Sequence, residues 1–221
     1  MKKSIRILRQ YLRYYFGNRL MIQLPYRKNN VTNRSNICIE GYPRSANSWF
    51  NRYFKRSNPN SNIAHHIHLL SQVVKALKYN IPTVVLIRNP LDCISSLHVF
   101  NNGETSLNLE IIEYITYYTH INKIKGKLVL VKFETAIQNP HRAVQAINDK
   151  YNLLFNVGDK GIISKIRNEY KTEKSQKNIN KTPTPAKERT KIKEKIMEPI
   201  IKNSQYKTAS DLYNLLIKDA I

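Results

Sequence analysis

Two short segments of the chain combine cationic and small polar side chains, the chemistry needed to bind a phosphate or sulfate group. The segments run Gly41-Tyr42-Pro43-Arg44-Ser45-Ala46-Asn47-Ser48-Trp49 and Arg88-Asn89-Pro90-Leu91-Asp92-Cys93-Ile94-Ser95-Ser96. Each follows a short apolar run typical of a strand and leads into a helical pattern. A strand that turns into a helix directs free backbone N–H groups and the positive end of the helix dipole at one point. Both segments therefore predict anion sites.

In the first segment, Arg44 supplies a permanent cation with a fork of donors. Ser45, Asn47 and Ser48 supply short polar groups that cap the helix or reach an oxyanion. Trp49 either faces an adenine ring or fills the core beneath the loop. The spacing argues against a nucleoside-triphosphate P-loop, which needs Gly and Lys at positions 46 and 47. The remaining alternative is a capped strand-to-helix turn that binds nothing.

In the second segment, Asn89 and Pro90 form a helix-start signature. Arg88, Asp92 and Ser96 then recur every four residues, so they lie close to one face of the predicted helix. We expect Asp92 to hold Arg88, and Arg88 with Ser96 to bind a second anion. The alternative is a helix cap with a local ion pair.

The ordered pair of segments resembles the sulfotransferases that use 3'-phosphoadenosine 5'-phosphosulfate (PAPS). In that family the first motif, typically Pro-Lys/Arg-Ser-Gly-Thr-Thr/Ser-Trp, binds the 5'-phosphosulfate. The second motif binds the 3'-phosphate through an Arg and a Ser that fall on Arg88 and Ser96. The resemblance continues through 128–134 and 139–140, and it implies this set of PAPS-binding residues: Arg44, Ser45, Ala46, Asn47, Ser48, Trp49, Arg88 and Ser96.

The chain departs from the family pattern at three places. Ala46 replaces the usual Gly and Asn47 the usual Thr, and Ala takes the same path only if its φ is negative. The Arg-Lys-Gly motif with which cytosolic members close over the 3'-phosphate is absent near the C-terminus. Lys187 or Arg189 is the candidate replacement.

Sulfuryl transfer needs a base for the acceptor proton and a cation for the departing phosphate, a role we assign to Arg44. The resembling family has a His between the two motifs, where this chain offers His65, His66 and His68. In an extended segment His66 and His68 point to one side and His65 to the other. The residues after His68 best resemble the family's His-Leu-Pro, so His68 is the first choice and His66 the second, with Glu40 as a fallback. No metal is predicted.

Short apolar runs alternate with longer helical patterns, which predicts an α/β fold. We expect a three-layer sandwich with a central parallel sheet of about four or five strands, the P-loop-like architecture that the resemblance also implies. The run 83–87 is continuously apolar and β-branched, typical of a strand buried on both faces. The length of 221 residues suits a single domain, 1–221, and the polar, proline-containing stretch 171–185 predicts a mobile surface loop.

Lysine and arginine number 37 against 15 acidic residues, a net charge of +22 that indicates an anionic partner. Two other functions stay open. One is a catalytically inactive basic domain that binds nucleic acid or acidic polysaccharide, and the other is a nucleotide kinase, for which the lysine and magnesium-binding carboxylate are not in place. The acceptor, a small molecule or a glycan, is not defined. Candidates to line its pocket are Phe100, Tyr117 and Tyr118, although the two tyrosines alternatively pack between helices. The oligomeric state is equally open.

Cys38 and Cys93 are too few for a disulfide framework or a zinc site, so we expect a reducing compartment and a cytoplasmic protein. The segment 1–27 mixes apolar residues with Arg and Lys and has neither a signal-peptide core nor a membrane span. It predicts a helix packed on the domain or, alternatively, a basic amphipathic helix in peripheral contact with a membrane.

Overall fold

A four-stranded parallel sheet forms the centre of the computed structural model, which describes residues 2–22, 29–174 and 187–221. The strands are β1 (Ile37–Gly41), β2 (Ile63–His65), β3 (Thr83–Ile87) and β4 (Val129–Lys132), in the order β2-β1-β3-β4. Every neighbouring pair runs parallel. The predicted α/β class and parallel sheet are confirmed.

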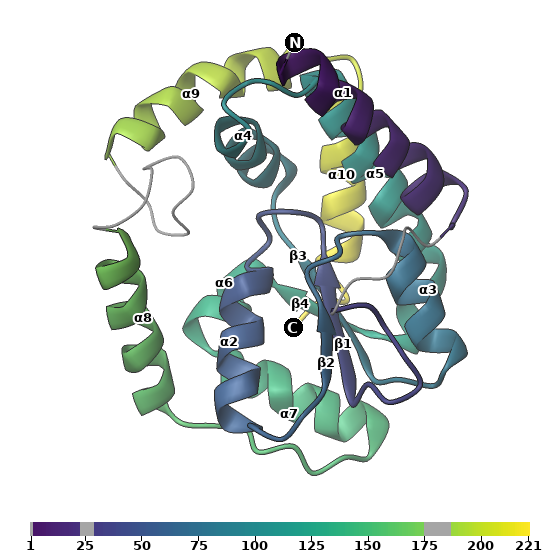
Figure 1. Cartoon of the computed structure of the whole chain (residues 1–221), viewed down its shortest axis with the longest axis vertical. Coiled ribbons are helices and arrows are strands. Elements are labelled where there is room, and N and C mark those ends of the chain that lie inside the picture. Colours follow the sequence, from purple (N-terminus) through teal and green to yellow (C-terminus); the bar gives the residue numbers. More distant parts are fainter. Residues whose placement is uncertain (1, 23–28, 175–186) are drawn as a thin grey trace.

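Helices cover both faces of the sheet and make three layers (Figure 1). One face carries α3 (Leu70–Lys78), α4 (Pro90–Phe100), α5 (Leu107–Ile124) and α10 (Tyr206–Leu216). The other carries α2 (Asn47–Ser57), α6 (Phe133–Gln138), α7 (Pro140–Tyr151) and α8 (Lys160–Lys174). A further helix, α9 (Lys187–Ile201), packs against α4. The helix predicted to start at Pro90 begins at that residue.

The continuously apolar sequence of β3 is explained by the helices that cover both faces of the sheet. Val85 and Ile87 enter the core beneath α4 and α5, whereas Val84 and Leu86 enter the core beneath α2 and α7. All residues of the strand are buried. A strand with apolar partners on both sides has no solvent face, so its side chains need not alternate in polarity.

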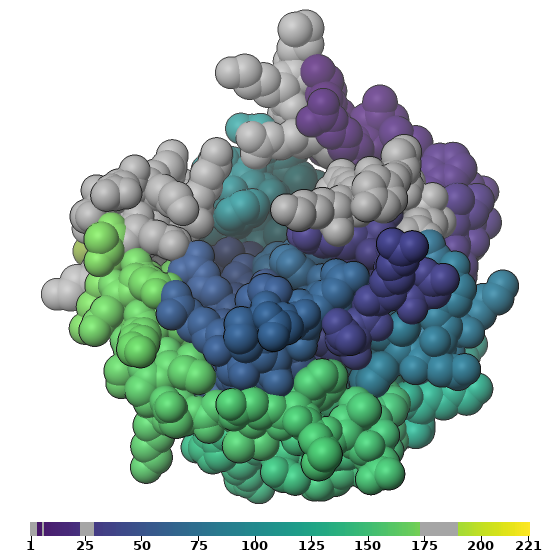
Figure 2. Space-filling view, turned by 60° about the horizontal axis from the view of Figure 1, so that its bottom comes forward, coloured from purple at the N-terminus to yellow at the C-terminus, as the bar shows by residue number. Residues whose placement is uncertain are grey.

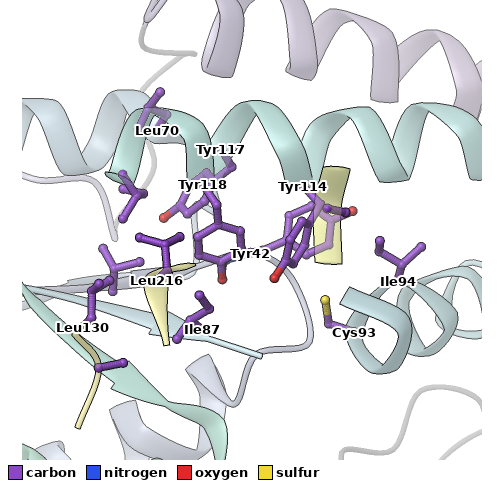
Figure 3. Packing of buried hydrophobic residues seen from close by; sticks show 14 of the residues in the cluster. Tyr42, Leu70, Ile87, Cys93, Ile94, Tyr114, Tyr117, Tyr118, Leu130 and Leu216 are labelled. Carbon is purple, nitrogen blue, oxygen red and sulfur yellow. The ribbon is translucent and has the colours of Figure 1, made fainter. Parts of the chain in front are cut away.

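Three tyrosines of α5 tie this helix to the sheet. Tyr114, Tyr117 and Tyr118 are fully buried, and they gather between α5 and the strands (Figure 3). The Tyr118 hydroxyl donates to the Leu86 carbonyl (2.7 Å), and the Tyr114 hydroxyl donates to the Arg88 carbonyl (2.9 Å). Tyr117 and Tyr118 therefore have the packing role that the sequence offered as the alternative to lining a pocket.

The N-terminal helix α1 (Lys2–Leu12) continues into a π-helix, η1 (Arg13–Arg19). The Asn18 side-chain oxygen accepts from the Leu70 N–H (2.9 Å), so it caps the start of α3. Gly17 lies so close to Leu69 that a Cβ there would meet its side chain at 2.5 Å. This part of the chain is packed on the domain, as one of the two N-terminal predictions requires.

Among the described residues, no helix has the length and apolar character to span a bilayer. Residues 171–174 form the last turn of α8, so the loop predicted from residue 171 begins too early. The rest of that prediction, 175–185, lies outside the described residues, as do the side chains of Lys187 and Arg189.

Truncating the central strand tests this account of the core. Leu86→Ala is expected to destabilise the protein by about 2–5 kcal/mol, because a fully buried side chain leaves a cavity. Leu154→Ala is the matched control, since Leu154 is 100% exposed and its truncation should change stability by less than about 0.5 kcal/mol. Urea unfolding followed by circular dichroism measures both, and equal midpoints for the two variants would contradict the packing described.

Candidate anion-binding site

Three neighbouring strands end at one edge of the sheet, because β2, β1 and β3 lie side by side and run parallel. Each strand leads into a segment with chemistry predicted from the sequence: 66–69 after β2, 42–46 after β1 and 88–89 after β3. The helix after β1 covers one face of the sheet, and the helices after β2 and β3 cover the other. The connections that leave β1 and β3 therefore run in opposite directions along the sheet. Open α/β sheets bind ligands at such a switch point.

The two predicted anion segments contact each other at this point. An Arg88 guanidinium N–H donates to the Arg44 carbonyl (3.0 Å). The Arg44 Nε–H donates in turn to the Ser96 hydroxyl (3.1 Å). The structure therefore brings Arg44, Arg88 and Ser96 into one cluster, although they come from two segments far apart in the sequence.

Each guanidinium of the cluster also lies over an aromatic ring. Arg44 lies 5.2 Å from the ring centre of Phe100, and Arg88 lies 4.0 Å from that of Phe133. Such contacts orient a cation. Phe100 was predicted to line an acceptor pocket, and its ring lies against the Arg44 guanidinium.

The carboxylate of Asp92 balances only part of this positive charge. It lies 3.9 Å from Arg88, as the four-residue spacing predicted. The Nζ of Lys193, on α9, pairs with the same carboxylate. Asp92 thus faces two cations, Arg88 and Lys193, an excess of positive charge that attracts an anion.

The backbone of the site adopts left-handed conformations that residues other than Gly seldom take. The φ angles are 70° at Arg44, 71° at Ala46, 61° at His66 and 58° at His68. The expectation of a negative φ at Ala46 is wrong. Ala46 has the conformation that a Gly would favour, and the Asn47 amide holds the turn by donating to the Tyr42 carbonyl (3.0 Å).

Not every polar side chain of the first segment reaches the surface. Ser45 and Asn47 are buried, so they present their side chains to the protein interior. Ser48 is exposed, and Arg44 is half-buried. Trp49 stacks on Tyr170 of α8, with ring centres 5.4 Å apart, which gives its ring a protein partner.

The three predicted base candidates lie together in the segment after β2. The Nε2 of His66 lies 2.6 Å from the Ser48 hydroxyl, and its Nδ1 lies 2.6 Å from the Nδ1 of His65. The prediction of opposite sides for His65 and His66 is wrong, because the strand ends at His65 and the positive φ at His66 reverses the direction of the chain.

Glu40 holds this histidine segment against the end of β1. Its two carboxylate oxygens accept the N–H groups of Ile67 (2.9 Å) and His68 (2.8 Å). The His68 ring donates through Nδ1 to the Gly41 carbonyl (2.9 Å), and Arg13 donates to the His68 carbonyl (3.0 Å). The predicted fallback base is fully buried and engaged in fixing the backbone.

Burial sets the protonation of these groups. Desolvation raises the pKa of Glu40 to about 7, against the opposing effect of its two backbone donors. Desolvation lowers the pKa of His65 to about 4 and that of His68 to about 3. The pKa of His66 is lowered by the same cause. All three imidazoles are therefore uncharged at neutral pH.

The sequence reasoning missed Arg13 as a residue of this site. Its positive charge lowers the pKa of both Glu40 and Glu113. Burial raises the pKa of Glu113, on α5, to about 7. The sequence held one signal for this role of Arg13. The arginine stands within an apolar N-terminal pattern, and no acidic residue lies near it in the sequence to pair with it.

Comparison with solved structures finds a similarity of fold. No family model and no curated protein matches the sequence. The fold is similar to the crystal structure of mouse sulfotransferase SULT7A1 complexed with PAP, with a TM-score of 0.43 and 11% sequence identity over 67% of each chain. That protein bears the family name that the two sequence motifs suggested. At 11% identity, the chemistry of this chain has to be inferred from its own residues.

The buried carboxylate of Glu40 gives a pH test of the site. Its raised pKa means that the folded protein keeps a proton that the unfolded chain releases between pH 4.5 and about 7. The stability contributed by Glu40 is therefore fully present below pH 4.5 and is lost as the pH rises to about 7. Relative to Glu40→Gln, the wild type should lose up to about 3 kcal/mol over this window.

Urea unfolding at a series of pH values measures this difference. Leu154→Gln, at a fully exposed site, serves as the control and should follow the wild-type pH dependence. A Glu40→Gln curve parallel to that of the wild type would show that the carboxylate titrates normally.

Proposed function

We propose that the chain is a PAPS-dependent sulfotransferase, which transfers a sulfuryl group to a hydroxyl or amine of a small-molecule or glycan acceptor. The observation that carries the proposal is the contact between the two anion segments, in which Arg44 and Arg88 meet beside Ser96. PAPS carries phosphates at the 3' and 5' positions of one ribose. A protein that binds both must place two anion sites side by side.

The charge and shape of the cluster suit this donor. PAPS carries roughly four negative charges if its 3'-phosphate contributes up to two. The cations beside Asp92 attract the 3'-phosphate of PAPS. The backbone N–H groups at the start of α2 attract the 5'-phosphosulfate. In this proposal Arg88 and Ser96 bind the 3'-phosphate, and Arg44 with the turn before α2 binds the 5'-phosphosulfate.

The residues of the site have assigned parts in the transfer. The acceptor oxygen or nitrogen forms a bond to sulfur, the bond from sulfur to the phosphate oxygen breaks, and 3',5'-ADP leaves. Arg44 stabilises the charge that develops on the departing phosphate. The acceptor proton passes to the Nε2 of His66, whose hydrogen bond with Ser48 places it beside the first anion segment.

His66 suits the role of base better than His68, which the sequence placed first. His68 holds the loop by donating through Nδ1 to the Gly41 carbonyl, and burial lowers its pKa to about 3, far below neutral pH. A general base works best when its pKa lies near the operating pH. We therefore assign His68 to holding the loop and His66 to proton transfer.

Nucleotide preference tests the donor site. Wild-type protein is expected to bind 3',5'-ADP at least about tenfold more tightly than 5'-AMP, a difference of about 1.4 kcal/mol. Arg88→Ala should remove this preference because it deletes the 3'-phosphate partner. Arg56→Ala is the control, since Arg56 pairs with Glu169 away from the cluster. Isothermal titration calorimetry measures the affinities.

Equal affinity for the two nucleotides would exclude a 3'-phosphate site. Binding that depends steeply on salt and has no nucleotide preference would favour the alternative, a basic domain for nucleic acid or acidic polysaccharide. Tight binding of a nucleoside triphosphate with magnesium would favour the kinase.

Separate histidine variants test the base. His66→Ala should lower the release of 3',5'-ADP from PAPS by about 10²–10⁴-fold with a panel of hydroxyl and amine acceptors, and leave 3',5'-ADP binding intact. His68→Ala should lower the rate less and the stability more, since it loses the bond to Gly41. A larger rate loss for His68→Ala, or none for His66→Ala, would refute the assignment to His66.

A further inference from the structure

The outer face of α1 exposes large apolar side chains. Ile5, Leu8, Tyr11 and Leu12 are 44%, 58%, 53% and 42% exposed. Their spacing of three or four residues places them on one side of the helix, with Leu8 near the middle. Figure 1 shows α1 along the outside of the molecule, and in Figure 2 the N-terminal residues lie at its rim.

The opposite side of α1 is fixed to the body of the protein, so the apolar face cannot turn inward. Gln10 is buried, and its side chain accepts the Ser106 N–H (3.0 Å) and donates to the Ser106 carbonyl (3.4 Å). Tyr14, one turn further on, is also buried. The exposed face is a fixed feature of the fold.

The charge on α1 and η1 has a single sign. Glu40 is the first acidic residue of the chain, so every charged residue of these two helices is basic. Arg9 on α1 and Arg19 on η1 are exposed. Tyr11 and Tyr15 stack with ring centres 6.3 Å apart, and both are exposed. Tyrosine, with an apolar ring and a polar tip, is enriched where lipid tails meet water.

We propose that this face of α1 docks on the surface of an anionic lipid bilayer. The apolar side chains enter the boundary between headgroups and acyl chains, and the arginines contact lipid phosphates. The uniform positive charge selects this occupant, because a second copy of the chain would bring two basic helices together. The inference is independent of the proposed function, since no residue of α1 belongs to the cluster around Arg44.

Vesicle binding by the full chain tests the proposal. Wild-type protein should sediment with phosphatidylcholine vesicles that contain phosphatidylserine, and much less with phosphatidylcholine alone. Leu8→Glu should weaken binding roughly tenfold or more, because a charge cannot enter the acyl boundary. Arg9→Glu should weaken it and reduce its salt dependence.

Leu154→Glu is the matched control, because Leu154 is fully exposed and follows α7 in the sequence. Helix α7 lies at the opposite end of the molecule from α1 (Figure 1). It should bind like the wild type, and unchanged unfolding midpoints should show that all variants fold. Absence of wild-type binding to anionic vesicles, or equal binding by Leu8→Glu, would overturn the proposal. A wild-type protein that does not bind vesicles but self-associates, with the self-association lost in Leu8→Glu, would also overturn the proposal.

Discussion

The hydrogen bond from Arg88 to the Arg44 carbonyl is the interaction on which the candidate site depends. It joins the segment after β3 to the turn after β1, at the edge where both strands end. Parallel pairing of these two strands makes the contact possible, because it puts the residues that follow them side by side. Without it, the chain would have two separate helix starts, each with an ordinary structural explanation.

Strain and buried charge around this contact indicate that the site is held in a specific shape. Left-handed conformations at non-glycine residues cost of the order of 1–3 kcal/mol each, and four of them lie in the segments that follow β1 and β2. The carboxylate of Glu40 is fully buried, and it stabilises the segment after β2 by accepting two backbone N–H groups. Arg13 reaches the same segment from the N-terminal π-helix. Such an arrangement lowers the stability of the folded protein, but it fixes the side-chain positions that binding and proton transfer require.

Much of the fold and the core of the site could be predicted from the sequence, because local patterns encode them. The β-branched run of β3 and the prolines that open α4 and α7 mark element type and position directly. The spacing of Arg88, Asp92 and Ser96 gave their shared face, and the parallel sheet brought the first segment to them.

The remaining features depend on tertiary contacts that local patterns do not encode. Arg13 meets His68 across 55 residues, through a π-helix that no sequence pattern announced. The histidine arrangement depends on positive φ angles at His66 and His68, and nothing in those residue types requires such angles. Asn47 looked like a ligand side chain because its type suits an oxyanion, but the fold uses it to brace the turn.

A double-mutant cycle on nucleotide affinity tests most directly whether the two segments form one site. Arg44→Lys, Ser96→Ala and the double variant are compared with the wild type in titrations with 3',5'-ADP. A single shared site predicts losses that fail to add, with a coupling of about 0.5–3 kcal/mol. Losses that add within about 0.5 kcal/mol, or a wild type that does not bind the nucleotide, would contradict it.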